Sequence, residues 1–306
     1  MTAVGLVGAK GAPGVTTTAV LLAAVWPRPA CLLEADPSGG DLRWWQPRAD
    51  GLPLRPDTGV VSLLAAHRDA RPGPAALAAH AQQIQGGLPV VVGVGSPSQH
   101  RALSPTWQAL TCVVTDSAGP PAGQVDGVAQ LDVVVDAGRL GTDPGTDALL
   151  AALPLVMLVC RPTVASVAHA RHALAALGAL PMAGAPTPTG RAGLGVVVIG
   201  TASQQAQVRT ALAPVGPDMP GDAELFFGHL ADDPLAAGAL AGHWTRRLDR
   251  SPLIASGRRL AGELHDLLIR AEPTRTGSQR TAAPGAMSAP PRADDRGSAA
   301  PGGAVR

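Results

Sequence analysis

The chain has 306 residues, of which 46% are hydrophobic and 15% are charged, so it is long enough and apolar enough to bury one large α/β core. Its net charge of +1 at pH 7 creates no overall field that would draw it to nucleic acid or to an anionic membrane. The three cysteines, Cys31, Cys112 and Cys160, are too far apart for a zinc motif or a disulfide framework, so we expect buried thiols in a reducing compartment.

Short aliphatic runs alternate with longer helix-like segments along the chain. Most runs are continuously apolar, as expected of strands that are covered on both faces. Strands that alternate with helices predict an α/β fold with a doubly wound, mostly parallel sheet and helices on both faces. In chain order, we predict strands at 3–7, 30–33, 89–94, 132–135, 155–160, 195–199 and 225–230, and helices at 16–25, 164–177, 203–212 and 252–270.

The apolar run from Val15 to Val25 has some likeness to a signal peptide. It lacks a basic start, and the Pro-Ala before Cys31 does not resemble a lipoprotein cleavage site. The run is also too short to span a bilayer. We therefore predict a cytoplasmic protein without an integral membrane segment.

The composition changes near residue 273. Residues 273–306 carry almost no bulky apolar side chains, so they cannot bury enough surface to offset the entropy of ordering. We expect one folded domain over residues 1–272 and a disordered tail, rich in Pro, Ala and Gly, over residues 273–306. Three segments inside the domain, 44–59, 116–127 and 181–193, are predicted to be long loops.

The first predicted strand is followed by the segment A-K-G-A-P-G-V-T, which opens the first predicted helix. In a phosphate-binding loop, glycines let backbone N–H groups turn toward an anion, and a helix N-terminus points at it. Against the pattern G-x-x-x-x-G-K-[ST], Gly14 and Thr16 are kept, Ala9 replaces the first glycine, and Val15 replaces the lysine. Against that pattern alone, an Ala- and Gly-rich turn into a helix is an equal alternative. Lys10 is the only lysine of the chain.

Two acidic segments follow later predicted strands. The second strand runs into L-L-E-A-D-P-S-G-G-D, which contains Glu34 and Asp36, and the strand in L-D-V-V-V-D-A-G-R-L ends at Asp136. An unpaired carboxylate at the end of a buried strand is costly, although a solvated Asp-Pro and Gly-Gly turn remains an alternative for residues 37–40. An Asp at a strand end is commonly structural when taken alone. With Thr16 and Asp36, however, Asp136 completes the oxygen ligands expected of Mg²⁺.

Together the three segments resemble the ParA/MinD family of P-loop ATPases with a deviant Walker A loop. The first resembles K-G-G-x-G-K-[ST]-[ST], the second resembles "vDaDpqGg", and the third resembles a Walker B strand. Similar segments occur in actinobacterial MinD-like proteins with a degenerate loop, so we interpret Val15 as a subfamily trait. Segments 155–163 and 228–242 extend the resemblance over residues 3–270, while Gly200 and Thr201 replace the family's base-contacting Asn or Asp.

The resemblance implies a P-loop NTPase domain over residues 1–272, with ATP and Mg²⁺ as cofactors. It implies that Lys10 is the signature lysine, which reaches the partner's phosphates in a homodimer, and that Asp36 is associated with magnesium and the attacking water. These two residues are the expected catalytic residues. The expected metal ligands are Thr16, Asp36 and Asp136, and the expected nucleotide-binding residues are Lys10, Gly11, Ala12, Pro13, Gly14, Val15, Thr16 and Thr17.

The family's function is that of a nucleotide-dependent dimerising switch. The resemblance therefore implies a role in positioning or partitioning a cargo such as a chromosome, a septum, or pilus or secretion machinery, with an unidentified protein partner. Because phosphoryl transfer depends on positioned positive charge, the replacement of the loop lysine by Val15 predicts weak or absent hydrolysis with some retained binding. One alternative is a non-catalytic scaffold of the same fold that has lost the nucleotide and acts by protein–protein interaction. Another is an amidoligase or reductase-type relative that shares the loop.

Two smaller features carry weaker signals. His169 and His172 are three apart on a predicted helix, but the lack of a third ligand nearby favours solvated side chains over a metal site. Trp44 and Trp45 are predicted either to face a partner or to cover the site, with packing under the long loop as the expected role of at least one.

The densest basic cluster lies late in the chain. ParA-like proteins bind DNA non-specifically through basic residues in this region, and such contacts would be sensitive to salt. The small net charge favours a solvated helix face instead, so DNA binding is not the preferred interpretation. The cluster comprises Arg246, Arg247, Arg250, Arg258 and Arg259.

Overall fold

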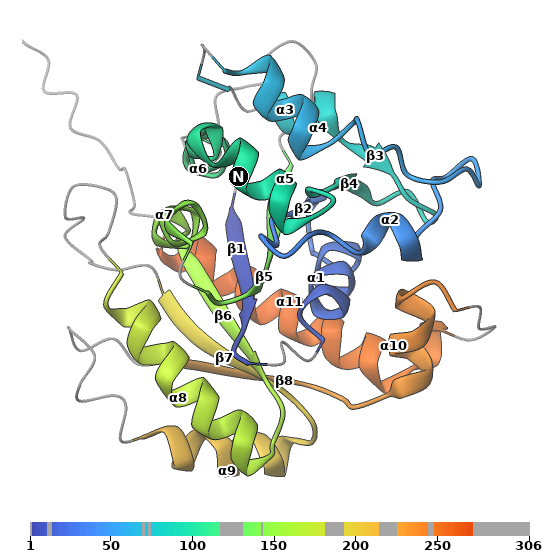
Figure 1. The fold of residues 1–306 in the computed structure, drawn as a ribbon. Helices are drawn as coiled ribbons and strands as arrows, with labels where there is room; N and C mark the ends of the chain where they lie inside the picture. Colours follow the sequence, from blue (N-terminus) through green and yellow to red (C-terminus); the bar gives the residue numbers. More distant parts are fainter. Residues whose placement is uncertain are drawn as a thin grey trace, which may run out of the picture. The chain divides into compact units, whose positions relative to one another are not determined.

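The centre of the fold is an eight-stranded sheet, seen here in a computed structural model (Figure 1). Its strands lie in the order β3 (Gln82–Gln83), β4 (Pro89–Val91), β2 (Ala30–Glu34), β5 (Asp132–Arg139), β1 (Ala3–Gly8), β6 (Leu155–Cys160), β7 (Gly193–Ile199) and β8 (Phe226–Leu230). Neighbouring strands are parallel, except that β3 runs antiparallel to β4. The structure describes residues 2–10, 14–68, 71–72, 75–116, 131–141, 143–180, 193–213, 225–243 and 248–271.

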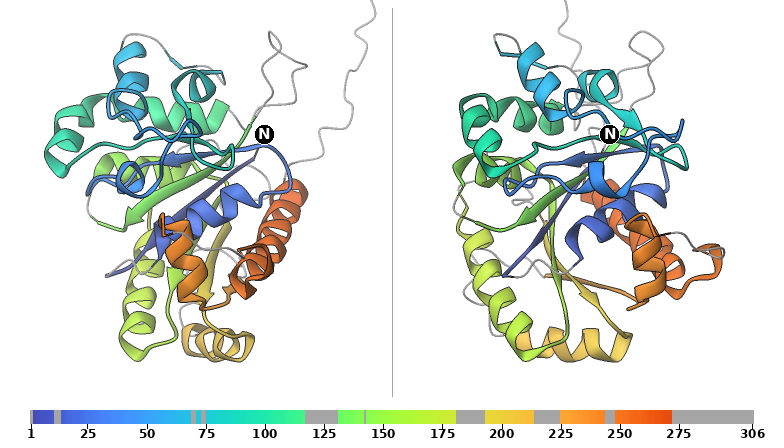
Figure 2. Two further views of the ribbon diagram at one scale, coloured as in Figure 1. Left: turned by 90° about the vertical axis from the view of Figure 1, so that its right-hand side faces the viewer. Right: turned by 45° about the vertical axis from the view of Figure 1, so that its right-hand side comes forward.

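Helices cover both faces of this sheet (Figure 2). One face carries α1 (Val15–Ala24), α10 (Pro234–Leu240) and α11 (Pro252–Ala271), and the other carries α6 (Gln108–Asp116), α7 (Pro144–Ala152), α8 (Val164–Gly178) and α9 (Ala202–Leu212). The predicted doubly wound α/β fold is therefore confirmed. The remaining described helices are α2 (Leu42–Trp45), α3 (Val60–Ala66), α4 (Ala76–His80), α5 (Pro97–Leu103) and the short 3-10 turns Ser104–Thr106 and Leu248–Arg250.

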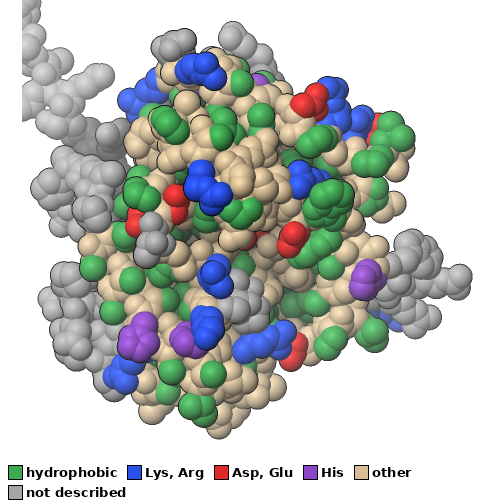
Figure 3. Space-filling model, in the orientation of Figure 1, with side chains coloured by type: hydrophobic (Ala, Val, Ile, Leu, Met, Phe, Trp, Pro, Cys, Tyr) green, Lys and Arg blue, Asp and Glu red, His purple; other side chains and the backbone are tan. Residues whose placement is uncertain are grey.

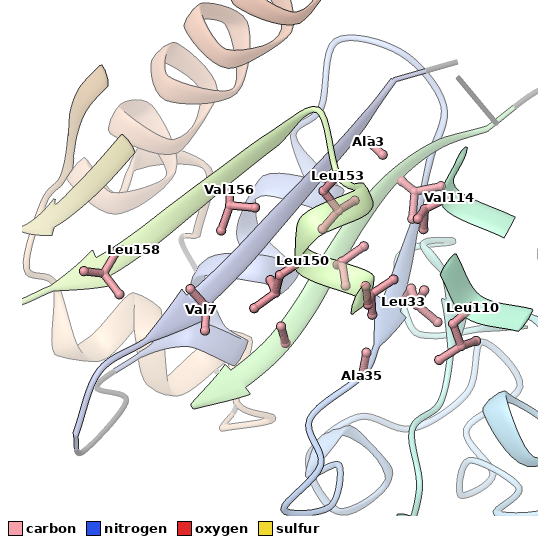
Figure 4. Close-up of a cluster of buried hydrophobic side chains, with 14 of the residues drawn as sticks. Ala3, Val7, Leu33, Ala35, Leu110, Val114, Leu150, Leu153, Val156 and Leu158 are labelled. Atoms are coloured by element: carbon pink, nitrogen blue, oxygen red, sulfur yellow. The ribbon is translucent and has the colours of Figure 1, made fainter. Parts of the chain in front are cut away.

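Each face of the sheet has its own hydrophobic core. Val7 and Leu33 point toward the layer of α6, α7 and α8, where Leu110 and Leu150 pack near them (Figure 4). Leu32, the neighbour of Leu33, points to the opposite face and joins the core beneath α1. Full burial of such a side chain contributes about 1.5–3 kcal/mol, so the two layers hold the central strands rigidly in place.

The strands and long helices agree with those predicted from the sequence. All seven predicted strands are present, although β4 ends at Val91 rather than at residue 94, and β5 continues beyond its predicted end to Arg139. The two-residue β3 and the helices α2 to α7 and α10 were not predicted, since short elements show too little periodicity. The segments 117–127 and 181–192 of the predicted loops, and the predicted tail over 273–306, lie outside the described residues. Among the described helices, none has the length and apolar character needed to cross a bilayer.

Candidate functional site

The carboxyl ends of β1, β2 and β5 lie next to one another at one edge of the sheet. Ala9 and Lys10 continue from β1, and Gly14 leads directly into α1. Crevices at such edges are where α/β sheets bind their ligands. Lys10 is exposed, while the loop residues Gly11, Ala12 and Pro13 lie outside the described part of the chain.

Gly14 fixes the way in which the loop enters α1. Its φ of 82° lies in the left-handed region, and a Cβ atom there would come within 2.9 Å of Ile199 Cδ1. Glycine is the residue that tolerates both conditions. The Gly14 carbonyl accepts a hydrogen bond from Thr18 N at 2.9 Å, so the N–H groups of the preceding residues in the first turn have no intrahelical partner. Free N–H groups at a helix end are suited to binding an anion.

Val15 has a structural role that its place in the loop did not reveal. Its side chain is 2% exposed and belongs to the apolar core beneath α1, together with Ile199. The side chain is therefore directed into the protein, and only the Val15 backbone N–H remains to contact an anion. Thr16 and Thr17, which follow on α1, are partly exposed.

Asp136 is the most completely buried carboxylate of the site. It is 0% exposed, and Gly138 N donates a hydrogen bond to its Oδ1 at 3.0 Å. Burial raises the pKa of Asp136 to about 6, and the charges of Asp36 and Asp41 reinforce this rise. The nearby Thr16 hydroxyl and the Gly138 N–H act against it. Among the described residues, none makes a hydrogen bond to the Oδ2 atom of Asp136.

Asp36 lies against Gly138, near the carboxyl end of β5. Gly138 has a φ of 63°, and a Cβ atom there would overlap the Asp36 carboxyl group. Ser38 N donates to Asp36 Oδ1 at 2.7 Å. Burial raises the pKa of Asp36, while these hydrogen bonds with Ser38 and the charge of Arg139 lower it. The structure thus brings Asp36 beside Asp136 because a glycine separates them.

These oxygens fit a small divalent cation. A buried carboxylate oxygen without a donor is costly unless a proton or a cation satisfies it, and Asp136 Oδ2 is such an atom. Mg²⁺ is usually held by one or two carboxylates together with water and substrate phosphates. In the described part of the chain, no group of three or more His, Cys, Asp and Glu side chains could hold a metal by itself. A magnesium ion at Thr16, Asp36 and Asp136 would therefore complete its shell with phosphate and water.

Glu34 has a role that the sequence alone did not show. It pairs in register with Asp136 on the neighbouring strand and is 1% exposed. Its Oε1 accepts a hydrogen bond from Leu42 N at 3.0 Å, and its Oε2 accepts one from Gly93 N at 2.8 Å. Burial raises the pKa of Glu34 to about 7, against these backbone hydrogen bonds. Glu34 therefore ties the segment after Asp36 to the end of the adjacent strand.

A small cavity of about 100 Å³ lies beside the first turn of α1. Gly14 and Thr17 line it on one side, and Ile199 and Leu230 line it on the other. Asp233 also lines the cavity, but its carboxylate is already occupied: Oδ1 accepts from Ala236 N at 3.1 Å, and Oδ2 accepts from Ser251 Oγ at 2.7 Å. Asp233 therefore caps α10 and anchors the start of α11.

The two tryptophans after the Asp36 segment lie in different surroundings. Trp44 is 72% exposed, and the Arg43 guanidinium lies 4.6 Å from its ring centroid. Trp45 is partly buried, and its carbonyl oxygen lies against Gly242, where a side chain would not fit. Trp44 therefore faces outward, and a packing role for the Trp45 side chain stays a prediction.

The remaining candidates are surface groups. His172 is exposed and His169 is partly exposed on α8. The described members of the basic cluster, Arg250, Arg258 and Arg259, are exposed, whereas Arg246 and Arg247 lie outside the described residues. Figure 3 shows one face of the molecule, on which basic side chains are interspersed with acidic and apolar ones.

Comparison with known proteins finds similarity at the level of structure. No protein-family model and no curated protein sequence matches the chain. The ParA family ATPase from Chlorobium tepidum is 14% identical, with 85% of this chain and 98% of that chain covered and a TM-score of 0.57. The cell division ATPase MinD of Pyrococcus furiosus is 17% identical, with 87% and 99% covered and a TM-score of 0.57.

A third solved structure contains bound ligands. Cobyrinic acid a,c-diamide synthase from Mycobacterium smegmatis, with ADP and magnesium, is 16% identical, with 87% of this chain and 94% of that chain covered and a TM-score of 0.55. At such low identities the likeness establishes the fold. The chain has the fold of the ParA/MinD family ATPases, as its motifs predicted, and a diamide synthase shares that fold.

Proposed function

We propose that this chain is a ParA/MinD-like switch protein that binds ATP and Mg²⁺ at the carboxyl edge of its sheet and dimerises in that state. The observation that carries the proposal is the unpartnered Oδ2 of the fully buried Asp136, beside Thr16 and Asp36 and at a helix end opened by Gly14. The buried Asp136 and the partly buried Asp36 lie beside the first turn of α1, an arrangement that suits a cation bound together with a phosphate.

Each described residue has a distinct task in this proposal. The first turn of α1 donates backbone N–H groups to the phosphates, and the Thr16 hydroxyl and the two aspartates hold the cation. Bound Mg²⁺ would neutralise phosphate charge. Asp36 orients the attacking water, and its raised pKa lets it accept a proton. Lys10, exposed at the end of β1, reaches the phosphates bound by a second copy of the chain.

Hydrolysis is expected to be weak. The Val15 side chain lies in the core, so the loop has no cation where P-loop ATPases place their lysine. Loss of one such electrostatic contact typically slows catalysis by about 10²–10³-fold. Backbone N–H groups and magnesium still support binding. The nucleotide therefore acts as a ligand that controls assembly more than as a fuel that is rapidly consumed.

The main alternative is a scaffold that has lost its nucleotide. Isothermal titration of the full chain with ATP and Mg²⁺ separates the two functions, with Asp57→Asn, an exposed carboxylate outside the site, as the matched control. Our proposal predicts a saturable heat for the wild-type and control chains and nucleotide-dependent dimers in sedimentation. No heat at millimolar ATP would favour the scaffold.

Lys10→Ala separates dimerisation from catalysis. The variant should bind ATP but fail to form the nucleotide-dependent dimer, because the lysine acts on the partner's phosphates. Hydrolysis at the rate of an ordinary P-loop ATPase, abolished in this variant, would instead show that Lys10 has taken over the role lost at Val15.

The wider biological role follows from the same proposal. A dimerising switch of this fold would position or partition a cargo such as a chromosome, a septum or secretion machinery, through a protein partner. The folded unit would span residues 1–272 with the tail over 273–306 outside it. An amidoligase function is not favoured, since we identify no second-substrate site among the described residues. DNA binding is not favoured either, because the net charge of +1 is small.

A further inference from the structure

An ion pair crosses the edge of the sheet beside the proposed phosphate site. Arg161 follows β6 and Asp232 follows β8, and Arg161 Nη1 lies 3.0 Å from Asp232 Oδ2. The two strands are not neighbours, because β7 lies between them. The pair therefore passes over the carboxyl end of β7.

Gly200, the first residue after β7, is closely surrounded by Gln204 and Pro162, the residue after Arg161. A Cβ atom at Gly200 would press on the Gln204 side-chain oxygen and would lie 3.3 Å from Pro162 Cγ. The Arg161 backbone is fixed as well, since its N–H donates to Ser166 Oγ at 3.0 Å. The backbone of Arg161 is thus anchored to Ser166 at the start of α8, and its side chain is joined to Asp232 by the ion pair.

The pair borders the small cavity next to α1. Arg161 and Asp232 line the same cavity as Gly14 and Thr17, at which the proposed phosphates would end. The group attached to those phosphates, the nucleoside, would therefore extend toward this cavity. Its walls include the apolar side chains of Leu21, Ile199 and Leu230, which suit the two flat faces of a base.

The polar groups at the cavity are suited to reading the edge of that base. The side chains of Arg161 and Asp232 are 41% and 49% exposed, so the cavity opens to solvent where they stand. Arg161 offers hydrogen-bond donors, and Asp232 offers acceptors. The third charged residue of the lining, Asp233, has both carboxylate oxygens occupied by α10 and Ser251.

We propose that Arg161 and Asp232 select the base of the bound nucleotide; this inference rests on the proposed function. Asp232 accepts a hydrogen bond from the exocyclic amine of adenine, and Arg161 donates one to a ring nitrogen of the same base. Hypoxanthine carries an oxygen in place of that amine and presents an acceptor to the Asp232 carboxylate. The pair therefore discriminates ATP from ITP.

The test compares three ligands that share phosphates but differ in the base. The full chain is titrated, with Mg²⁺, against ATP, ITP and inorganic tripolyphosphate, which has no base. We expect the wild-type chain to bind ATP about tenfold more tightly than ITP, in line with an unpaired polar contact at a half-exposed site. In Asp232→Asn the ratio should fall to about one, because the amide can donate to the oxygen of ITP.

Arg161→Ala should weaken ATP binding about tenfold and leave tripolyphosphate binding unchanged. The matched control is Asp57→Asn, which breaks the exposed pair of Arg55 and Asp57, of 2.9 Å, and should leave all three affinities unchanged. Melting curves of the variants establish that each is folded. A loss of base discrimination in a variant that is still folded is then caused by the change in the Arg161–Asp232 pair.

Several outcomes would overturn the inference. Equal wild-type affinity for ATP and ITP, or an unchanged ratio in Asp232→Asn, would show that the pair does not read the base. Parallel losses of ATP and tripolyphosphate binding in Arg161→Ala would show that the arginine acts on phosphate. In each of these cases the wild-type chain still binds ATP, so the proposed function stands. A wild-type chain that binds none of the three ligands contradicts the proposed function together with this inference.

Discussion

Gly138 separates the two aspartates of the proposed magnesium site, and Gly138→Ala would disturb both. The backbone φ of 63° costs a residue with a Cβ about 1–2 kcal/mol. The new methyl group would also overlap the Asp36 carboxyl group, and such overpacking typically costs about 1–3 kcal/mol. We therefore expect about 2–5 kcal/mol of lost stability from the two terms together.

Gly51→Ala is a control that carries the backbone cost of a positive φ without the cost of overpacking. Gly51 has a φ of 79°, and a Cβ atom there would meet nothing within 4 Å. Denaturation with urea should show a smaller loss for Gly51→Ala than for Gly138→Ala. The difference between the two variants is the free energy of displacing Asp36.

The same two variants separate ligand binding from backbone strain. Displacing a group that positions a metal ligand commonly lowers metal affinity about 10–100-fold, so Gly138→Ala should bind Mg·ATP weakly in isothermal titration. Gly51→Ala should bind it like the wild-type chain. Equal Mg·ATP affinity in the two variants would refute our reasoning that Gly138 seats Asp36 beside Asp136.

Two further predictions concern the loop and the buried acids. Val15→Lys places an amine at a position that is 2% exposed, so the unfolding free energy of the nucleotide-free chain, measured in urea, should fall by about 1–3 kcal/mol. The rate of ATP hydrolysis should rise at least about tenfold, because the loop regains a cation. Unchanged stability would contradict the packing role of Val15. Asp136 has a folded-state pKa of about 6, above its unfolded value, so its carboxyl group holds a proton more tightly in the folded chain. Its contribution to stability is therefore complete below about pH 4 and is lost as the pH rises through about 6. Between pH 5 and 7 the unfolding free energy of the nucleotide-free wild-type chain should fall relative to that of Asp136→Asn, and parallel pH profiles would contradict this assignment.

The strands of the fold could be predicted because they are continuous apolar runs. The short β3 could not, since its place depends on Gln82, whose side chain bonds the backbone of Arg55 and Thr58. These contacts join residues far apart in sequence, and no local pattern records them. The helices α2 to α7 and α10 were missed for a related reason, because each is too short to show a clear period.

The convergence of Thr16, Asp36 and Asp136 could be anticipated from the motifs and from the parallel arrangement of the strands. The side-chain partners at this edge could not. Glu34 was recognised as acidic, but its two backbone donors come from segments that only the folded chain brings together. The pair of Arg161 and Asp232 requires the knowledge that β6 and β8 flank β7, which the sequence does not contain.

The central claim is that Asp136 is kept as a buried carboxylate in order to hold a cation with ATP. Asp136→Asn keeps a side-chain oxygen that accepts the hydrogen bond from Gly138 N. It removes a carboxyl group whose pKa is raised from 3.8 to about 6. At pH 7.5 this should stabilise the nucleotide-free chain by about 2–3 kcal/mol. Mg·ATP at about 100 times its Kd should stabilise the wild-type chain by about 2.7 kcal/mol and the variant hardly at all.

The most direct measurement is therefore the melting temperature of the two chains with and without Mg·ATP. We predict a crossed result, in which the variant melts higher alone and only the wild-type chain gains on addition of the nucleotide. Equal gains in both chains, or a variant that melts lower than the wild-type chain without nucleotide, would contradict the account.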